Sequence, residues 1–111
     1  MKSIITTIIL TMVLSINVNA MSLNDQAICG ILFSTVSSSN RQQGNIKMEN
    51  VWRQKMLDMM NNMRKYGYED DTITKAIGDN MPKALNILKS LEYNKAEYKK
   101  FINKCLDEIE K

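Results

Sequence analysis

The clearest hydrophobic pattern in the chain lies between residues 48 and 66. Its apolar members follow one another at steps of four, four, three, four and three residues: Met48, Trp52, Met56, Met59, Met63 and Tyr66. Such spacing places all of them on one face of a helix, whereas a strand would need alternation. Polar and charged residues occupy the opposite face, and Gly67 follows as a natural stop. The pattern therefore predicts an amphipathic helix that ends near Gly67.

An earlier helix is predicted to start at Ser22. Ser22 and Asp25 have the spacing of a capping box. In this motif the serine hydroxyl accepts a hydrogen bond from a backbone N–H of the first turn, and the acid three residues later accepts one from the backbone N–H of the serine. The residues of its mostly apolar stripe then recur every three or four positions: Ala27, Ile28, Ile31, Leu32, Thr35 and Val36. The stripe ends in the polar residues 37–40, and Gly44 marks a turn, since glycine adopts a left-handed conformation without steric cost. We expect residues 40–45 to form a polar loop.

Residues 71–92 carry a third helical stripe, and Pro82 lies inside it. The stripe consists of Ile73, Ala76, Ile77, Met81, Leu85, Leu88 and Leu91. A proline inside a helix costs about 3 kcal/mol. Residues 78–80 (Gly-Asp-Asn) offer a stop, and Pro82 would fit the first turn of a new helix. We expect two nearly collinear helices, at 71–79 and 81–92, and a single kinked helix is the alternative.

The final segment completes an all-α pattern. Asn94 and Glu97 resemble a second capping box, and helical spacing continues through Tyr98, Phe101, Ile102, Cys105 and Ile109. No segment shows the alternation of a strand, so we expect one domain over residues 21–111, a small bundle of four to five helices. Cys29 and Cys105 lie in or beside the apolar stripes of the first and last helices. This placement predicts a disulfide that joins those two helices.

Residues 1–20 have the form of a cleavable signal peptide. Lys2 precedes an uncharged, mostly apolar run over residues 4–16, which is short for a membrane span. Short side chains end the segment, so we expect cleavage between Ala20 and Met21, and a mature chain in the periplasm or outside the cell without a transmembrane anchor. Export also accounts for the cysteine pair, because oxidising compartments favour disulfides. Closing a loop of 76 residues stabilises a small fold by about 4 kcal/mol.

The composition excludes several classes of function. The chain has no histidine, which is the commonest general base near neutral pH and a common metal ligand. Its four glycines lie far apart, so no phosphate-binding loop is present. A net charge of +3, one unit of it from Lys2, lacks the clustered excess of a nucleic-acid binder. We therefore expect no enzymatic activity, no cofactor, no metal site and no nucleic-acid partner.

Two features remain as candidate binding sites. Thioethers are concentrated over residues 56–63, and Met59, Met60 and Met63 are candidate partner contacts if part of their face is exposed. Core packing is the alternative for these methionines, and Cu(I) binding is another, since thioethers are soft ligands. The polar loop supplies Arg41 and Gln42 as further candidates, because loops carry recognition more often than packed faces do.

Without catalytic groups, the domain is expected to work by binding a protein in the cell envelope, as a monomer or a homodimer. An inhibitor, an immunity protein or an envelope accessory protein would all act in this way. A periplasmic stress chaperone is the alternative, and a methionine-rich Cu(I)-binding protein is a further one. In general plan the chain is similar to small periplasmic immunity proteins, acid chaperones and secretion pilotins, a similarity of architecture alone.

Overall fold

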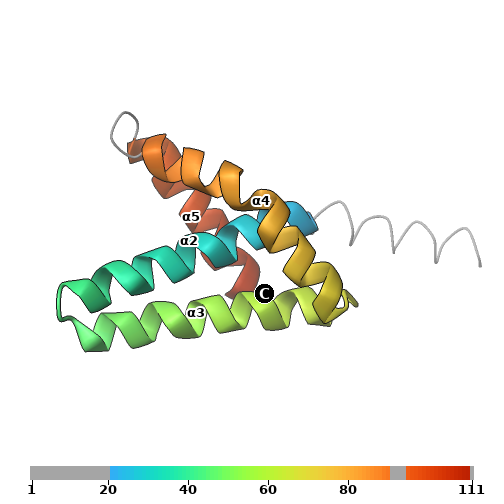
Figure 1. Cartoon of the computed structure of the whole chain (residues 1–111), viewed down its shortest axis with the longest axis horizontal. Helices are drawn as coiled ribbons and strands as arrows, with labels where there is room; N and C mark the ends of the chain where they lie inside the picture. The colour runs from blue at the N-terminus through green and yellow to red at the C-terminus, as the bar shows by residue number, and fades with distance from the viewer. Residues whose placement is uncertain (1–20, 91–94, 111) are drawn as a thin grey trace, which may run out of the picture.

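The computed structural model describes residues 21–90 and 95–110, and its regular structure there is entirely α-helical. In chain order the helices are α2 (Leu23–Gln42), α3 (Ile46–Lys65), α4 (Asp70–Ser90) and α5 (Lys95–Glu110). Figure 1 shows α2 and α3 as a long antiparallel hairpin, with α4 across one side of α2 and α5 behind it. The predicted all-α bundle is thereby confirmed. The predicted signal peptide lies outside the described residues.

The N-terminal half of α2 is the centre of the bundle. Residues 26–33 form an unbroken buried run, because α3, α4 and α5 all pack against this helix. Around it the three other helices contribute a few fully or almost fully buried apolar side chains: Met59 and Met63 of α3, Ile73 and Ala84 of α4, and Ile102 and Cys105 of α5. The C-terminal half of α2, beyond this core, is packed mainly on α3 and is largely exposed.

A disulfide links α2 to α5. Cys29 and Cys105 are both fully buried, and their Cα atoms lie 5.6 Å apart, inside the usual range for disulfides. The bond predicted from the two apolar stripes is therefore confirmed. It fixes α5 beside the buried half of α2.

The segment around Pro82 corrects the expectation of two helices at 71–79 and 81–92. α4 continues from Asp70 to Ser90 with Pro82 inside it. Pro82 is exposed, and so is Gly78, whose carbonyl the proline ring crowds in a straight helix. Figure 1 shows the helix bending near its middle, as a proline inside a helix usually requires. The alternative of one kinked helix is the correct one.

Buried Asn80 fastens the bent part of α4 to α2. Its Nδ2 donates to the carbonyl oxygen of Ala76 at 2.7 Å and to Oδ1 of Asn24 at 3.0 Å. The first bond supports α4 just before the proline, and the second reaches across to the start of α2. Asn80 therefore belongs to the body of the helix and does not act as the stop that the sequence suggested.

The end of α2 is the second correction. We expected a loop over residues 40–45, but α2 continues to Gln42 and only residues 43–45 connect it to α3. Polar side chains of this part of α2 find acceptors within the helix: Thr35 Oγ1 donates to the Ile31 carbonyl and Asn40 Nδ2 to the Val36 carbonyl, both at 2.9 Å. Gly44 then turns the chain with a φ of 77°.

Candidate functional site

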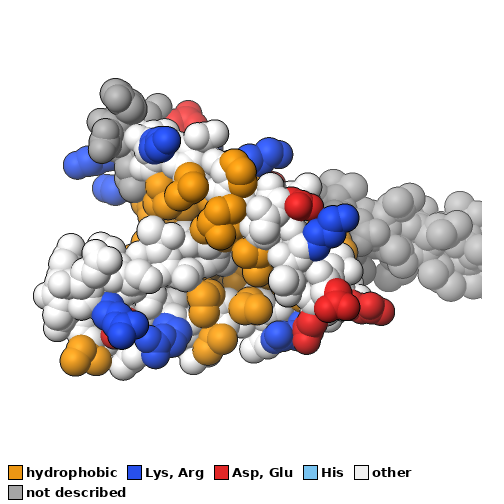
Figure 2. Space-filling model, viewed as in Figure 1, with side chains coloured by type: hydrophobic (Ala, Val, Ile, Leu, Met, Phe, Trp, Pro, Cys, Tyr) orange, Lys and Arg blue, Asp and Glu red, His pale blue; other side chains and the backbone are white. Residues whose placement is uncertain are grey.

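An apolar groove opens between α2, α3 and α4. It has a volume of about 230 Å³, and the three helices line it with Gly30, Ile31, Ser34 and Thr35 of α2, Met56 and Met60 of α3, and Ile77 and Met81 of α4. Figure 2 shows the hydrophobic side chains on both walls, facing each other across this hollow. The groove is the largest concentration of accessible apolar surface visible on that face.

The floor of the groove is low because α2 has small side chains there. Gly30 and Ser34 are one helical turn apart, and a Cβ placed on Gly30 would meet no heavy atom within 4 Å. A glycine inside a helix costs about 0.5–1 kcal/mol relative to alanine. No neighbouring helix packs so closely on Gly30 that a methyl group there would be excluded. The space above Gly30 is therefore open to a bound side chain.

The walls of the groove extend beyond its lining. Met81 is 40% exposed, and Leu85, one turn further along α4, is 50% exposed. Methionine side chains are unbranched and flexible, so such walls adapt to ligands of different shape. The result is an adaptable apolar surface with a recessed centre.

The structure divides the methionines that the sequence grouped together. Met59 and Met63 are fully buried in the core, so they belong to the core-packing alternative and are not accessible to a partner. Met60 is partly buried and lines the groove. The sequence did not single out Met81 or Gly30, although Met81 lies on the edge of the α4 stripe and away from its buried members. Partner binding by Met60, and Cu(I) binding, stay predictions.

This division predicts an order of oxidation by dilute hydrogen peroxide. Met81 and Met48, which are 40% and 36% exposed, should become sulfoxides first, whereas the fully buried Met59 and Met63 should be protected. Peptide mass spectrometry at successive times measures the order. In denaturant all four should react alike, and equal rates for Met63 and Met81 in the folded protein would contradict the assigned burial.

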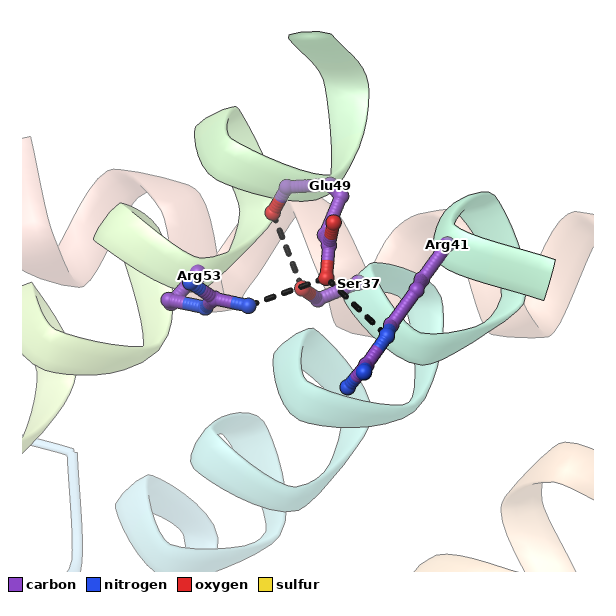
Figure 3. Close-up of polar contacts among 4 residues, drawn as sticks. All are labelled: Ser37, Arg41, Glu49 and Arg53. Atoms are coloured by element: carbon purple, nitrogen blue, oxygen red, sulfur yellow. Dashed lines mark hydrogen bonds and ion pairs between the residues drawn. The ribbon is translucent and has the colours of Figure 1, made fainter. Parts of the chain in front are cut away.

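Arg41 and Gln42, the other predicted contacts, are exposed in the last turn of α2, and Arg41 joins a polar cluster (Figure 3). At its centre, the Glu49 side chain is only 10% exposed. Its Oε2 lies 2.9 Å from Nη2 of Arg53 and 3.9 Å from Nε of Arg41. Ser37 Oγ donates to the Glu49 backbone carbonyl at 2.9 Å. The cluster thus joins α2 to α3 near the hairpin turn.

A second polar network lies within the bundle and is structural. Asn62 Nδ2 donates to Oε1 of Gln26 at 2.9 Å and to Oε1 of Glu108 at 3.3 Å, and the Tyr66 hydroxyl donates to the same Glu108 oxygen at 2.9 Å. These bonds connect α2, α3 and α5. Among the described residues no buried side-chain nitrogen or oxygen lacks a hydrogen-bond partner. The network thereby satisfies groups that would otherwise destabilise the core.

Apart from the groove, the described residues give few signs of a functional site. Within residues 21–90 and 95–110, no group of three His, Cys, Asp or Glu side chains is arranged to hold a metal ion, and no helix is both long and apolar enough to cross a membrane. Burial raises the pKa of the Tyr98 hydroxyl above its usual value of 10.0, so this phenol stays neutral near neutral pH. The groove and the Glu49 cluster remain as the candidate binding surfaces.

Known proteins offer no guide to this groove. No protein-family model matches the chain, and no curated protein or solved structure is significantly similar to it. The function of the groove therefore has to be argued from its shape and chemistry.

Proposed function

We propose that this chain is an exported binding protein, which holds an apolar segment of a partner protein in the groove between α2, α3 and α4. The observation that carries the proposal is the methionine lining of the groove, to which α4 contributes the exposed Met81 and α3 the partly buried Met56 and Met60. A concave apolar surface on the outside of a protein is a common form of ligand-binding groove. An inhibitor, an immunity protein or an envelope accessory protein would use the groove in this way.

The size of the groove favours a polypeptide over an enclosed small ligand. Pockets for drug-sized molecules usually measure about 300–1,000 Å³, and this groove is smaller, at about 230 Å³. On α4 the exposed Leu85 lies one turn beyond Met81 on the same side of the helix, so apolar surface continues past the lining there. An amphipathic helix would fill such a surface, with one or two apolar anchors in the hollow and others over its walls.

The test compares two exposed methionines. Met81→Glu places a charge in the groove, whereas Met48→Glu makes the same change at a methionine of similar exposure, 36% against 40%, outside the lining. We expect the wild type and Met48→Glu to retain one partner from cell-envelope extract at a one-to-one ratio, and Met81→Glu to lose it. Circular dichroism shows whether both variants are folded. Equal retention by all three proteins, or no stoichiometric partner, would overturn the proposal.

The chaperone alternative predicts a different result in the same variants. A chaperone should suppress the aggregation of several unrelated proteins under acid or heat, because an adaptable methionine wall does not require one sequence. Loss of that activity in Met81→Glu, without any one-to-one partner, would favour the chaperone. Indifference of the wild type to all such clients would exclude it.

A further inference from the structure

The Glu49 cluster carries an excess of positive charge. Arg41 and Arg53 share one carboxylate, so three charged groups leave a net charge of +1. The two arginine side chains are 76% and 51% exposed. Each guanidinium has five N–H donors, more than its contact with Glu49 uses. Donors are therefore left over for an anionic group from outside.

The cluster is also held in place. Glu49 is almost buried between the helices, and its backbone carbonyl accepts the Ser37 hydroxyl from α2 (Figure 3). Its carboxylate orients Arg53 through a hydrogen bond of 2.9 Å. An arginine that is already oriented loses less conformational freedom when it binds a second carboxylate. Orientation by a nearly buried carboxylate distinguishes Arg53 and its neighbour Arg41 from isolated surface arginines.

The arginine pair lies on the same side of the hairpin as the groove. On α3, Glu49, Arg53, Met56 and Met60 follow at steps of four, three and four residues, so they share one helix face. On α2, Arg41 is seven residues, or two turns, beyond the floor residue Ser34. At 1.5 Å per residue, the cluster lies about 10 Å along the hairpin from the groove.

The opposite end of this face has charges of both signs. Asp70 and Asp71 occupy the first turn of α4, and Figure 2 shows carboxylates gathered at that end, away from the paired cations. Arg64 is also there and contacts Asp70 at 2.8 Å, and Lys65 and Lys75 lie near it. That end is therefore mixed in charge, and the unbalanced charge along this face is the arginine pair at the α2–α3 turn. A ligand helix with a carboxylate over that pair would complement it.

We propose that the segment bound in the groove is an amphipathic helix that carries an aspartate or glutamate two turns from its apolar anchor, and that Arg41 and Arg53 bind this carboxylate. The inference rests on the proposed function, because it names the chemistry of the segment that the groove takes. Two turns of a ligand helix also span about 10 Å, so one helix reaches the groove and the arginines together.

The experiment uses three designed helical peptides as probes. All have the same leucine anchors at positions i, i+3 and i+4. They differ only at one position two turns from the first anchor, which is glutamate, glutamine or lysine; this position is i+7, or i−7 in a second set of three for a helix that binds in the opposite direction. Fluorescence anisotropy measures their binding to the oxidised chain. We expect the glutamate peptide to bind about three- to tenfold more tightly than the glutamine peptide, and the lysine peptide to bind most weakly. This preference should shrink as salt screens the charges.

Variants assign the preference to the arginine pair. Arg41→Gln and Arg53→Gln should each reduce the preference for glutamate while binding of the glutamine peptide stays unchanged. Arg64→Gln is the matched control, because Arg64 is an exposed arginine with its own carboxylate, and it should keep the preference. Arg41 is the safer variant for folding, since its contact with Glu49 is long, at 3.9 Å. Arg53→Lys, which keeps the charge, should restore part of the preference.

The outcomes separate the two proposals. If no peptide binds the wild type, or if Met81→Glu binds as well as the wild type, the groove function fails and this inference fails with it. If the peptides bind in the groove but glutamate and glutamine do not differ, only the inference about the arginines fails. Binding of phosphatidylglycerol vesicles that depends on Arg41 and Arg53, without any peptide preference, would assign the pair to a membrane surface and overturn the inference.

Discussion

Replacing Cys29 and Cys105 together by alanine is expected to lower the free energy of unfolding by about 4 kcal/mol. The disulfide closes a loop across 76 residues, so its loss releases much conformational freedom in the unfolded chain. A domain of this size has a total stability of only about 5–15 kcal/mol. The variant should therefore lose much of its stability, and part of the population should unfold at growth temperature.

Urea titration of the variant and of the oxidised wild type measures this effect. Wild type that is reduced after unfolding, with its thiols kept reduced, is the control, and it should approach the stability of the alanine variant. A loss of less than about 1 kcal/mol would show that packing alone holds α5 beside α2, which contradicts the role given to the bond.

The second large effect is expected from Phe33→Ala. Phe33 is fully buried on α2, and its ring centroid lies 5.7 Å from that of Trp52 on α3, with the planes tilted by 43°. Truncation removes the largest of the fully buried side chains among the described residues and leaves a cavity, which typically costs about 3–5 kcal/mol. Trp52 reports the change directly, because its fluorescence should shift when its aromatic neighbour is lost.

Ile46→Ala is the matched control for this substitution. Ile46 lies at the start of α3 and is 67% exposed, so its truncation should change the free energy of unfolding by less than about 0.5 kcal/mol. Chemical denaturation followed by circular dichroism compares the two variants. A similar loss in both would mean that the hairpin turn is buried by a contact with another molecule in solution.

The sequence was sufficient for the class of fold and for the disulfide. Apolar residues recur at helical spacing along almost the whole chain, and both cysteines lie within or beside such stripes. It was insufficient at Pro82, because the penalty for an internal proline depends on whether its surroundings permit a bend. Here Pro82 lies on the exposed side of α4 and Asn80 fastens the bent helix to α2, and both facts depend on the tertiary structure.

The candidate site was only partly predictable for a similar reason. A helical stripe identifies which residues share a face, but it does not say where along that face the neighbouring helices cover it. Met59 and Met60 are adjacent in sequence, yet the first is in the core and the second lines the groove. Arg41 was chosen as a loop residue, whereas it is helical and contacts Glu49 of the next helix.

The disulfide has a consequence for how the groove admits a ligand. Cys29 is followed directly by Gly30, so a covalent bond holds the helix immediately next to the groove floor. No such bond is present in α3 or α4 within the described residues. Hydrogen bonds tie both walls to the same helix, from Ser37 to the Glu49 carbonyl on α3 and from Asn80 of α4 to Asn24. The base and the walls are therefore held in place before a ligand arrives, so that binding loses less conformational freedom than it would in a flexible site.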